Sequence, residues 1–339
     1  MGNFWRNHRF GIIYGLLLVA FTTYALLDVF LITRRYEVVE NTQEISYRNN
    51  NINNKNGNTS DGSNIVNNRS NTVNNRRNAV NSRSNINSNN IINSEAKVTE
   101  TEYKDKNITI SLTTYRVYDT DIYVADIKLS SLDYLKTAFA ENTYGRNVKE
   151  YTSVIAKENN AILAINGDFY GAQSQGYVIR NGVLYRSSAV KGNEDLVIYD
   201  DGTWEIIKES EITAEELLKS GAQQVFSFGP ALIENGQISV TEKTEVGKAM
   251  NSNPRTAIGL IEDLHYVFVV SDGRTNSSRG LSLYQLAHFM KTLGVKTAYN
   301  LDGGGSSTMY FNGRVINNPT TDGRTIRERK VSDIVYIGY

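Results

Sequence analysis

The spacing of hydrophobic and polar residues divides the chain of 339 residues into three zones. In the first zone, residues 1–40, an apolar run of about 22 residues extends from Gly11 to Ile32 between flanking basic residues. A helix of that length, rising about 1.5 Å per residue, matches the roughly 30 Å apolar core of a bilayer. The run is too long for a signal peptide, and no small-residue cleavage site follows it. The sequence predicts an uncleaved, single-pass transmembrane helix, with the basic tail in the cytoplasm and the C-terminal domain outside the cell membrane.

The second zone, residues 41–96, is rich in asparagine and carries tandem seven-residue units such as "NNRSNTV" and "NNRRNAV". A seven-residue period is typical of coiled coils, but each unit has a single apolar residue, and asparagine is a poor helix former. The zone has too little apolar content to offset the entropy of ordering the chain. We therefore predict a disordered linker.

The third zone, residues 97–339, has the patterns of one globular domain rich in strands. The segments "ITISLTTYRVY" and "DIYVADIKLS" are dense in β-branched and aromatic residues, as strands are. Asn181-Gly182 and Asp201-Gly202 stand between apolar runs, where hairpin turns are expected. A helix is expected to lead into the buried strand within "TSVIAKENNAILAINGDFY".

Two further helices are predicted from capping residues. In "SLYQLAHFMKTLG", Ser282 is the expected N-cap with Gln285 three residues later, and an apolar stripe follows. In "TAEELLKSG", Thr213 and Glu216 form the same pattern. Because strands outnumber helices and the two are interspersed, we predict an α+β fold with a mixed β-sheet core.

Composition and charge exclude several kinds of site. The chain has no cysteine, which excludes disulfides, thiolate metal sites and cysteine nucleophiles. Of its three histidines, only His265 and His288 lie in the third zone, so a histidine-based zinc site or a Ser-His-Asp triad there would have to use one or both of them. From residue 95 onward, 26 Lys and Arg stand against 31 Asp and Glu, and this acidic balance argues against a nucleic acid partner.

Acids and arginines gather in four loops next to strand-like runs. The loops carry Asn166 and Asp168 in "AINGDFYG", Arg255 in "NPRTAIGL", Asp272, Arg274 and Arg279 in "SDGRTNSSRG", and Asp302 in "NLDGGGSS". Polar groups beside glycines at strand ends are a common way for sheets to build functional sites, because the rigid strand aims the loop. Asp272 could equally be an ordinary Asp-Gly turn residue.

The glycine-rich stretch "NLDGGGSSTMYFNG", residues 300–313, matches none of the familiar glycine motifs. Three contiguous glycines, Gly303 to Gly305, fit neither a Walker A loop nor G-x-G-x-x-G, and no glycine follows for a G-x-S-x-G turn. Successive glycine N–H groups, with the hydroxyls of Ser306 and Ser307, could instead bind an anion. Asp302 would repel that anion, so the ligand is expected to carry a phosphate on one side and sugar hydroxyls or a reacting carbon on the other.

The segment "SDGRTNSSRGLSLYQLAHFMKTLGVKTAYNLDGGGSSTMYFNG" closely resembles the phosphodiester glycosidase domain family. The resemblance extends to "AINGDFYG", "FSFGPALI", "NPRTAIGL" and "RKVSDIVYIG", and so covers roughly residues 97–339. One departure is Asp168, where the family pattern often has a glycine. The resemblance implies hydrolysis of a sugar phosphodiester at the anomeric carbon, in cell-envelope or exopolysaccharide material.

Under that resemblance, Asp302 is expected to be the nucleophile or general base, and Asp168 its partner as a second carboxylate or a sugar-hydroxyl acceptor. The phosphate is expected to be stabilised by Arg255, Gly303, Gly304, Gly305, Ser306 and Ser307, with Arg279 and Arg329 as secondary partners. Asn166 and Asp272 complete the predicted substrate-binding set, and Asp272 could orient a hydroxyl or bind a cation.

The residues leave other functions open. The domain could bind phosphate-linked glycans without turnover, or it could transfer the sugar to another polymer instead of to water. A divalent cation could bind to Asp168, Asp272 and Asp302, although three acids scattered along the chain are weak evidence for such a site.

Overall fold

The computed structural model describes residues 2–36, 96–245 and 252–339. α1 (Gly2–Phe30) forms where the sequence predicts the apolar helix. Within the described residues, however, no helix combines the length and the apolarity that crossing a membrane requires. The predicted transmembrane helix and the single-pass membrane location are therefore wrong. Residues 41–95 of the predicted linker lie outside the described residues.

The described strands form four sheets. The smallest pairs β1 (Arg34–Arg35) with β7 (Gly145–Arg146). The nine strands of the large sheet are, in order, β15 (Gln237–Ile238), β14 (Ala231–Glu234), β18 (Thr297–Asn300), β16 (Arg255–Glu262), β17 (His265–Ser271), β5 (Thr120–Leu129), β4 (Ile108–Val117), β3 (Glu102–Lys104) and β2 (Lys97–Val98).

Two five-stranded sheets complete the domain. The β8 sheet has the order β20 (Arg314–Val315), β19 (Met309–Phe311), β8 (Leu163–Asn166), β21 (Asp333–Ile337), β6 (Leu135–Phe139). The β9 sheet has the order β10 (Val183–Arg186), β9 (Val178–Arg180), β13 (Ala222–Phe226), β11 (Glu194–Tyr199), β12 (Trp204–Lys208). The helices of the domain are α3 (Thr152–Glu158), α4 (Ala214–Lys219) and α5 (Leu283–Thr292), with short 3-10 turns η1 (Leu132–Tyr134), η2 (Ala140–Asn142), η3 (Tyr170–Ala172) and η4 (Gly304–Ser306).

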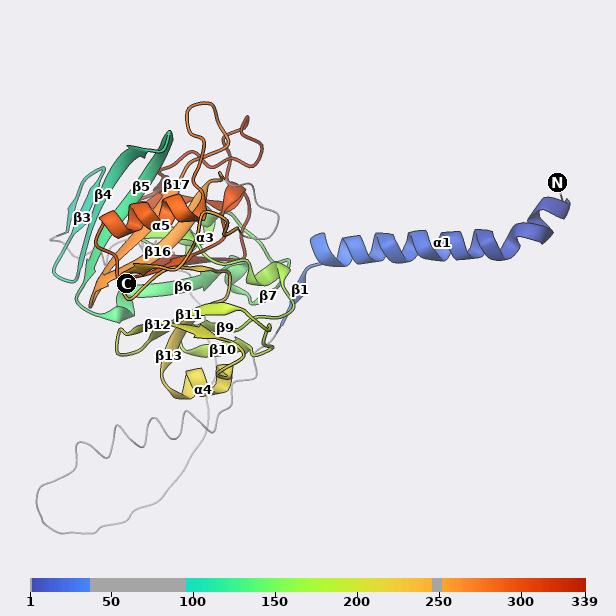
Figure 1. Ribbon diagram of the computed structural model, residues 1–339, viewed down its shortest axis with the longest axis horizontal. Helices are drawn as coiled ribbons and strands as arrows, with labels where there is room; N and C mark the ends of the chain where they lie inside the picture. The colour runs from blue at the N-terminus through green and yellow to red at the C-terminus, as the bar shows by residue number, and fades with distance from the viewer. Residues whose placement is uncertain (1, 37–95, 246–251) are drawn as a thin grey trace, which may run out of the picture. The chain divides into compact units, whose positions relative to one another are not determined.

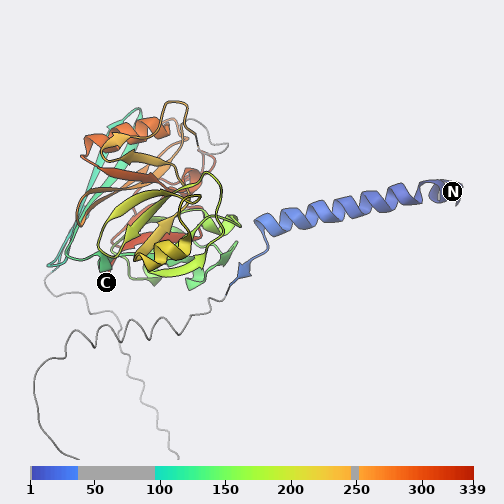
Figure 2. The ribbon, with the colours of Figure 1, turned by 60° about the horizontal axis from the view of Figure 1, so that its bottom comes forward.

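The large sheet and both five-stranded sheets share one hydrophobic core. In the ribbon, α5 lies beside the large sheet and α4 beside the β9 sheet (Figure 1, Figure 2). Ile127 and Phe268 of the large sheet belong to the shared core together with Leu163 and Val335 of the β8 sheet and Phe226 of the β9 sheet. A second cluster packs α5 against the large sheet, a third packs α3 against the β8 sheet, and a fourth packs α4 against the β9 sheet. Each of these three sheets therefore packs between the shared core and one helix.

The short helices begin where their capping residues predict. Ser282 and Gln285 form a capping box at α5, because each side chain accepts a backbone N–H of the other. Thr213 and Glu216 form the same box at α4. The predicted hairpins are confirmed as β9 with β10 and β11 with β12.

The sheet-rich α+β character is found, but the mixed sheet is not. In the part of the chain that the structure describes, the strand pairings are antiparallel. The run β17–α5–β18 explains the error, since a strand–helix–strand pattern is typical of parallel neighbours. Here β18 returns on the far side of β16, and both β17 and β18 pair antiparallel to that strand.

Candidate active site

Three segments meet the loop that follows β18, residues 301–308, which we call the glycine loop. Asp302 N donates a hydrogen bond to Gly167 O (3.2 Å), in the loop after β8. Gly304 N donates to Pro254 O (2.8 Å), just before β16, and Arg329 N donates to Gly305 O (3.2 Å). The glycine loop is thus fixed by backbone hydrogen bonds to three segments that are distant from it in the sequence.

The three glycines are explained by the close approach of neighbouring segments, and a Cβ at Gly303 would lie 2.9 Å from Pro254 O. A Cβ atom at Gly305 would lie 2.2 Å from Oγ1 of Thr321. Gly304 has φ +62°, and a Cβ there would lie 2.9 Å from Nη2 of Arg274. No other residue fits without moving the adjoining segments.

Of the predicted glycine N–H donors, those of Gly303 and Gly304 are already engaged, the first by the Asp302 carboxylate. The Gly304 N–H is bonded to Pro254 O, and the N–H groups of Ser306 and Ser307 donate within the loop to Gly303 O (3.3 Å) and Gly304 O (3.1 Å). An anion at this loop would therefore depend mainly on side-chain donors.

Asp302 is buried and faces Arg329. Nη2 of Arg329 lies 3.1 Å from Oδ2 of Asp302 and 3.4 Å from Oδ1, and Nε and Nη2 also donate to Ser306 Oγ (2.9 and 2.7 Å). Burial raises the pKa of Asp302 above its usual value, while the charge of Arg329 and hydrogen bonds from Ser306 and Gly303 oppose that rise. Arg329 itself is 40% exposed, so a ligand can reach this pair.

The side chain of Asn166 fixes the glycine loop by hydrogen bonds. Its Nδ2 donates to Asp302 O (2.6 Å), and its Oδ1 accepts from Thr256 Oγ1 (2.8 Å) and from Thr308 N (3.2 Å). Because Asn166 is fully buried and these bonds occupy both ends of its amide, it fixes the backbone that carries Asp302.

Arg274, which the predicted site set lacks, lies against the glycine loop. Its Nε and Nη2 donate to Asn253 Oδ1 (3.1 and 3.0 Å), and its Nη1 donates to Thr321 O (2.7 Å). Burial lowers the pKa of Arg274, the positive charge of Arg329 lowers it further, and Asp302 raises it. Arg274, Arg329 and Asp302 therefore form one electrostatic group.

Arg255 is a second buried cation behind the loop. Its Nε donates to Leu281 O (2.9 Å), and its Nη2 lies 3.9 Å from Oε2 of Glu245. Burial lowers the pKa of Arg255 to about 10, with Glu245 opposing the shift and Arg274 adding to it. The positive charge of Arg255 thus adds to that of Arg274 and Arg329 around one loop.

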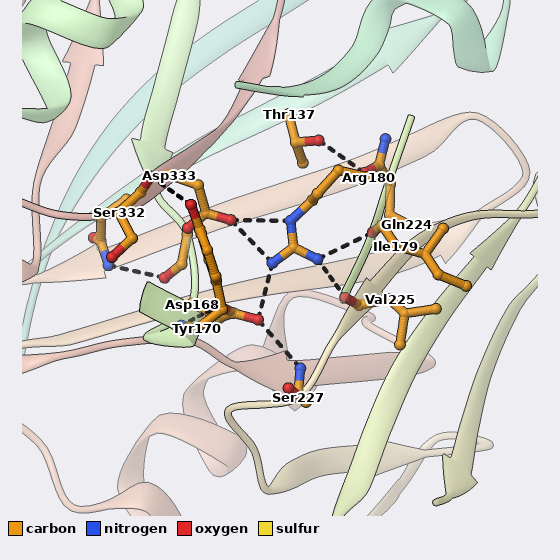
Figure 3. A network of polar contacts seen from close by, with 12 residues as sticks. Thr137, Asp168, Tyr170, Ile179, Arg180, Gln224, Val225, Ser227, Ser332 and Asp333 are labelled. Atoms are coloured by element: carbon orange, nitrogen blue, oxygen red, sulfur yellow. Dashed lines mark hydrogen bonds and ion pairs between the residues drawn. The ribbon is translucent and has the colours of Figure 1, made fainter. Parts of the chain in front are cut away.

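Asp168 lies in a different network (Figure 3). Its Oδ2 is 2.9 Å from Nη2 of Arg180, and the same Nη2 is 2.9 Å from Oδ2 of Asp333. Oδ1 of Asp168 accepts from Tyr170 N (2.8 Å), and Oδ2 also accepts from Ser227 N (3.3 Å). All three charged side chains are at most 2% exposed, so both oxygens of Asp168 are engaged within the protein.

Two other predicted site residues form no hydrogen bond or ion pair with Asp302 in the described structure, although Asn317 Nδ2 links Asp272 to Ser307 O of the glycine loop (2.9 Å). Asp272 accepts from Asn318 N (2.8 Å), from Asn318 Nδ2 (2.9 Å), from Asn317 Nδ2 (3.2 Å) and from Tyr123 OH (3.2 Å), so it braces the chain after β20. Arg279 is exposed and lies 3.9 Å from Asp119.

The acids Asp168, Asp272 and Asp302 do not assemble into a metal site. Within residues 2–36, 96–245 and 252–339, no group of three or more His, Asp or Glu side chains could hold a metal ion. The predicted cation therefore has no cluster of ligands among these residues.

Comparison with known families identifies the family of the chain. A sequence model described as phosphodiester glycosidase matches residues 159–338, more than half of the chain. The chain belongs to the phosphodiester glycosidase family. The matched segment contains every predicted site residue from Asn166 to Arg329, and the resemblance seen in the sequence is confirmed.

Relatives of this phosphodiester glycosidase chain include bacterial and animal proteins. The SPbeta prophage-derived protein YomE of Bacillus subtilis is 31% identical over 218 residues, which are 62% of this chain and 33% of YomE. The N-acetylglucosamine-1-phosphodiester alpha-N-acetylglucosaminidase of Mus musculus is 31% identical over 195 residues, which are 52% of this chain and 37% of the mouse protein. The chain thus spans about a third of the length of these curated relatives.

A solved structure supports the fold of the family domain. The catalytic domain of the zebrafish N-acetylglucosamine-1-phosphodiester alpha-N-acetylglucosaminidase superimposes with a TM-score of 0.55 at 23% identity. The match covers 68% of this chain and 83% of the zebrafish chain. At that identity the likeness concerns the arrangement of sheets and helices.

Proposed function

We propose that this chain hydrolyses glycosyl phosphodiesters and that Asp302 acts at the anomeric carbon. The observation that carries the proposal is the pairing of Asp302 with Arg329 beside two further arginines, Arg255 and Arg274. A carboxylate can act at the anomeric carbon of the sugar, and cations can stabilise the negative charge of the departing phosphate. Family membership supports the same reaction.

The proposed reaction breaks the bond between the anomeric carbon and the bridging phosphate oxygen. The bonding electrons leave with that oxygen, so the products are a phosphate monoester and a sugar whose new hydroxyl comes from water. A phosphate leaving group needs little protonation, which reduces the demand for a second catalytic acid. Asp302 either attacks the anomeric carbon or takes a proton from the water.

Arg329 links phosphate binding to the activation of Asp302. In the structure its guanidinium is bonded to Asp302 and Ser306, and this cation lowers the basicity of the carboxylate. A substrate phosphate would compete with Asp302 for the same cation, and a carboxylate released in that way is a stronger nucleophile or base.

For Asp168 we propose a structural role in place of the catalytic one. Both of its oxygens are bonded inside the protein, and Arg180 neutralises its charge. Asp168 would then fix the loop that carries Gly167, whose carbonyl accepts the Asp302 N–H. Asp302 would be the single chemically active carboxylate.

The proposed substrates are phosphodiester-linked sugars of cell-envelope or exopolysaccharide material. Two other uses of the same site are transfer of the sugar to a polymer and binding without turnover. Both predict an intact Asp302 group, so product analysis with and without a polymer acceptor separates them from hydrolysis.

The first test compares the chain with its Asp302→Asn variant on a sugar 1-phosphodiester, such as the methyl phosphodiester of N-acetylglucosamine. We expect turnover to fall at least about 100-fold, the range typical of a lost acid–base group. Asp263→Asn removes the same charge from an exposed turn and should keep full activity. Wild-type turnover by Asp302→Asn would refute the catalytic role.

The stereochemistry of the product decides between the two roles of Asp302. A nucleophilic carboxylate gives two successive displacements and retains the anomeric configuration, whereas a general base gives a single displacement and inverts it. NMR of the released sugar, recorded before mutarotation, distinguishes the two.

A further inference from the structure

A basic loop adjoins the candidate active site. Residues 320–330 carry four cationic side chains, Arg324, Arg327, Arg329 and Lys330, against two acids, Asp322 and Glu328. We call this segment the basic loop.

Both acids of the basic loop are engaged by neighbouring groups. Oδ1 of Asp322 accepts the backbone N–H groups of Thr325 and Arg324 (2.9 Å each), and these bonds hold the pKa of Asp322 down at about 2. The two oxygens of Glu328 accept from the backbone N–H and the hydroxyl of Ser153. Neither acid forms an ion pair with a cation of the loop in the described structure.

The basic loop is held in one conformation by its own hydrogen bonds. Thr320, which is fully buried, donates from Oγ1 to Thr325 O (2.8 Å) and accepts from Gly323 N (3.0 Å). A bridge pairs Thr320 with Ile326, and Arg327 N donates to Pro319 O (2.7 Å). A loop fixed in this way loses little entropy when it binds a ligand.

Contacts with Arg274 and Gly305 place the tip of the basic loop beside the glycine loop. Thr321 O accepts from Nη1 of Arg274, and a Cβ at Gly323 would lie 2.0 Å from Arg274 O. Thr321 also touches Gly305, where an added Cβ would lie 2.2 Å from its Oγ1. Arg324 therefore follows a residue that is packed on the site.

Arg324 and Arg327 are exposed, and their guanidinium groups form no hydrogen bond or ion pair with other described residues. Arg327 precedes by two residues the Arg329 that binds Asp302. Both arginines therefore belong to the same hydrogen-bonded loop as Arg329, and exposed guanidinium groups suit the recognition of phosphate.

We infer that Arg324 and Arg327 bind phosphates of neighbouring repeats, so that the substrate is a polymer of phosphate-linked sugars instead of a single glycosyl phosphodiester. This inference rests on the proposed hydrolysis for the position of the scissile bond. A monomer carries one phosphate, which the Asp302 group would bind, so it has no second phosphate for Arg324 and Arg327. A polymer offers a phosphate at each repeat.

The test uses synthetic oligomers of one, two, four and eight sugar-phosphate repeats with the full-length chain. We expect kcat/KM per scissile bond to rise with length over the first repeats. In Arg324→Gln/Arg327→Gln, that gain should fall by about 5- to 25-fold relative to the change for the monomer, since two exposed charge pairs contribute up to about a factor of five each. Lys104→Gln/Lys106→Gln removes the same charge from exposed residues of and next to β3 and should leave the length dependence unchanged.

Binding of the same oligomers to Asp302→Asn separates this inference from the proposed reaction. If the wild-type chain does not hydrolyse the monomer, but binding to Asp302→Asn still rises with oligomer length and falls when Arg324→Gln/Arg327→Gln is added, the reaction is refuted and the phosphate surface stands. If the monomer is hydrolysed and neither rate nor affinity depends on length, the reaction stands and the inference is refuted. Equal length dependence with neutral glucose oligomers would also overturn it.

Discussion

Replacing Arg180 tests whether Asp168 and Asp333 are held by a buried cation. Arg180→Met keeps most of the side-chain volume but leaves two buried carboxylates without their partner. It also removes the donor that Ile179 O and Val225 O share in the wild type. Breaking a buried ion pair by removing one partner costs about 3–5 kcal/mol. We expect the free energy of unfolding to fall by about that amount at pH 7.5.

The loss of stability should shrink as the pH falls. Burial raises the pKa of Asp333 to about 7 in the folded protein, the charge of Asp168 adds to that shift, and Arg180 opposes it. Without Arg180 the folded-state pKa of Asp333 rises further above the unfolded value of about 3.9. A group with a raised folded-state pKa contributes stability that is full below its unfolded pKa and is lost as the pH rises through its folded-state pKa. The loss in free energy of unfolding caused by Arg180→Met is therefore smaller at pH 4.5 than at pH 7.5.

Urea denaturation followed by tryptophan fluorescence measures the effect, because Trp204 lies in the β9 sheet that contains Arg180. Arg180→Lys keeps the charge without the planar donors and should fall between the wild type and Arg180→Met. Arg279→Met, at an exposed arginine, should change stability by no more than about 0.5 kcal/mol. A deficit below about 1 kcal/mol for Arg180→Met, or an equal deficit at both pH values, would refute the reasoning.

Two further outcomes follow from the Asp302 group. Hydrolysis should decline as the pH drops through the raised pKa of Asp302, because the reaction needs the carboxylate, and a pH–rate profile flat down to the usual aspartate pKa would contradict this role. Gly305→Ala should lower the free energy of unfolding by about 1–3 kcal/mol and reduce turnover, because the added Cβ would clash with Thr321. Thermal unfolding measures the first effect and steady-state kinetics the second. Gly305→Ala combined with Thr321→Ala should recover part of the stability, whereas no recovery would place the clash elsewhere.

Local signals explain the parts of the fold that the sequence predicts well. The capping box at Ser282 and the hairpin at Asn181-Gly182 depend on residues within a few positions of each other, and both are confirmed. The pairing of β18 with β16 depends on which of several strands it reaches, and periodicity contains no such information. For that reason the prediction of a mixed sheet is wrong, although most of the predicted strands and helices are found.

Length and composition alone predict a membrane span for the apolar run at the N-terminus, but the described helix does not meet the requirements of one. The site shows a similar limit. Asp168 and Asp302 look alike in sequence, since each is an acid after a buried strand. Their partners differ: Asp168 meets an arginine 12 residues later, and Asp302 meets Arg329. One available signal was Arg180 itself, because an arginine inside the apolar run "YVIRNGVLY" requires a buried acid.

The glycine loop shows that contiguous glycines can serve packing. The sequence predicts that they offer their N–H groups to an anion, and the structure shows that their lack of side chains also permits the close approach of Arg274 and Thr321. Because the Gly304 N–H is bonded to Pro254 O, a phosphate bound here as proposed would rely largely on guanidinium groups from segments before and after the loop. The proposed anion binding would then depend on the packing of those segments, and a substitution that only separates them should weaken phosphate binding while Asp302 stays in place.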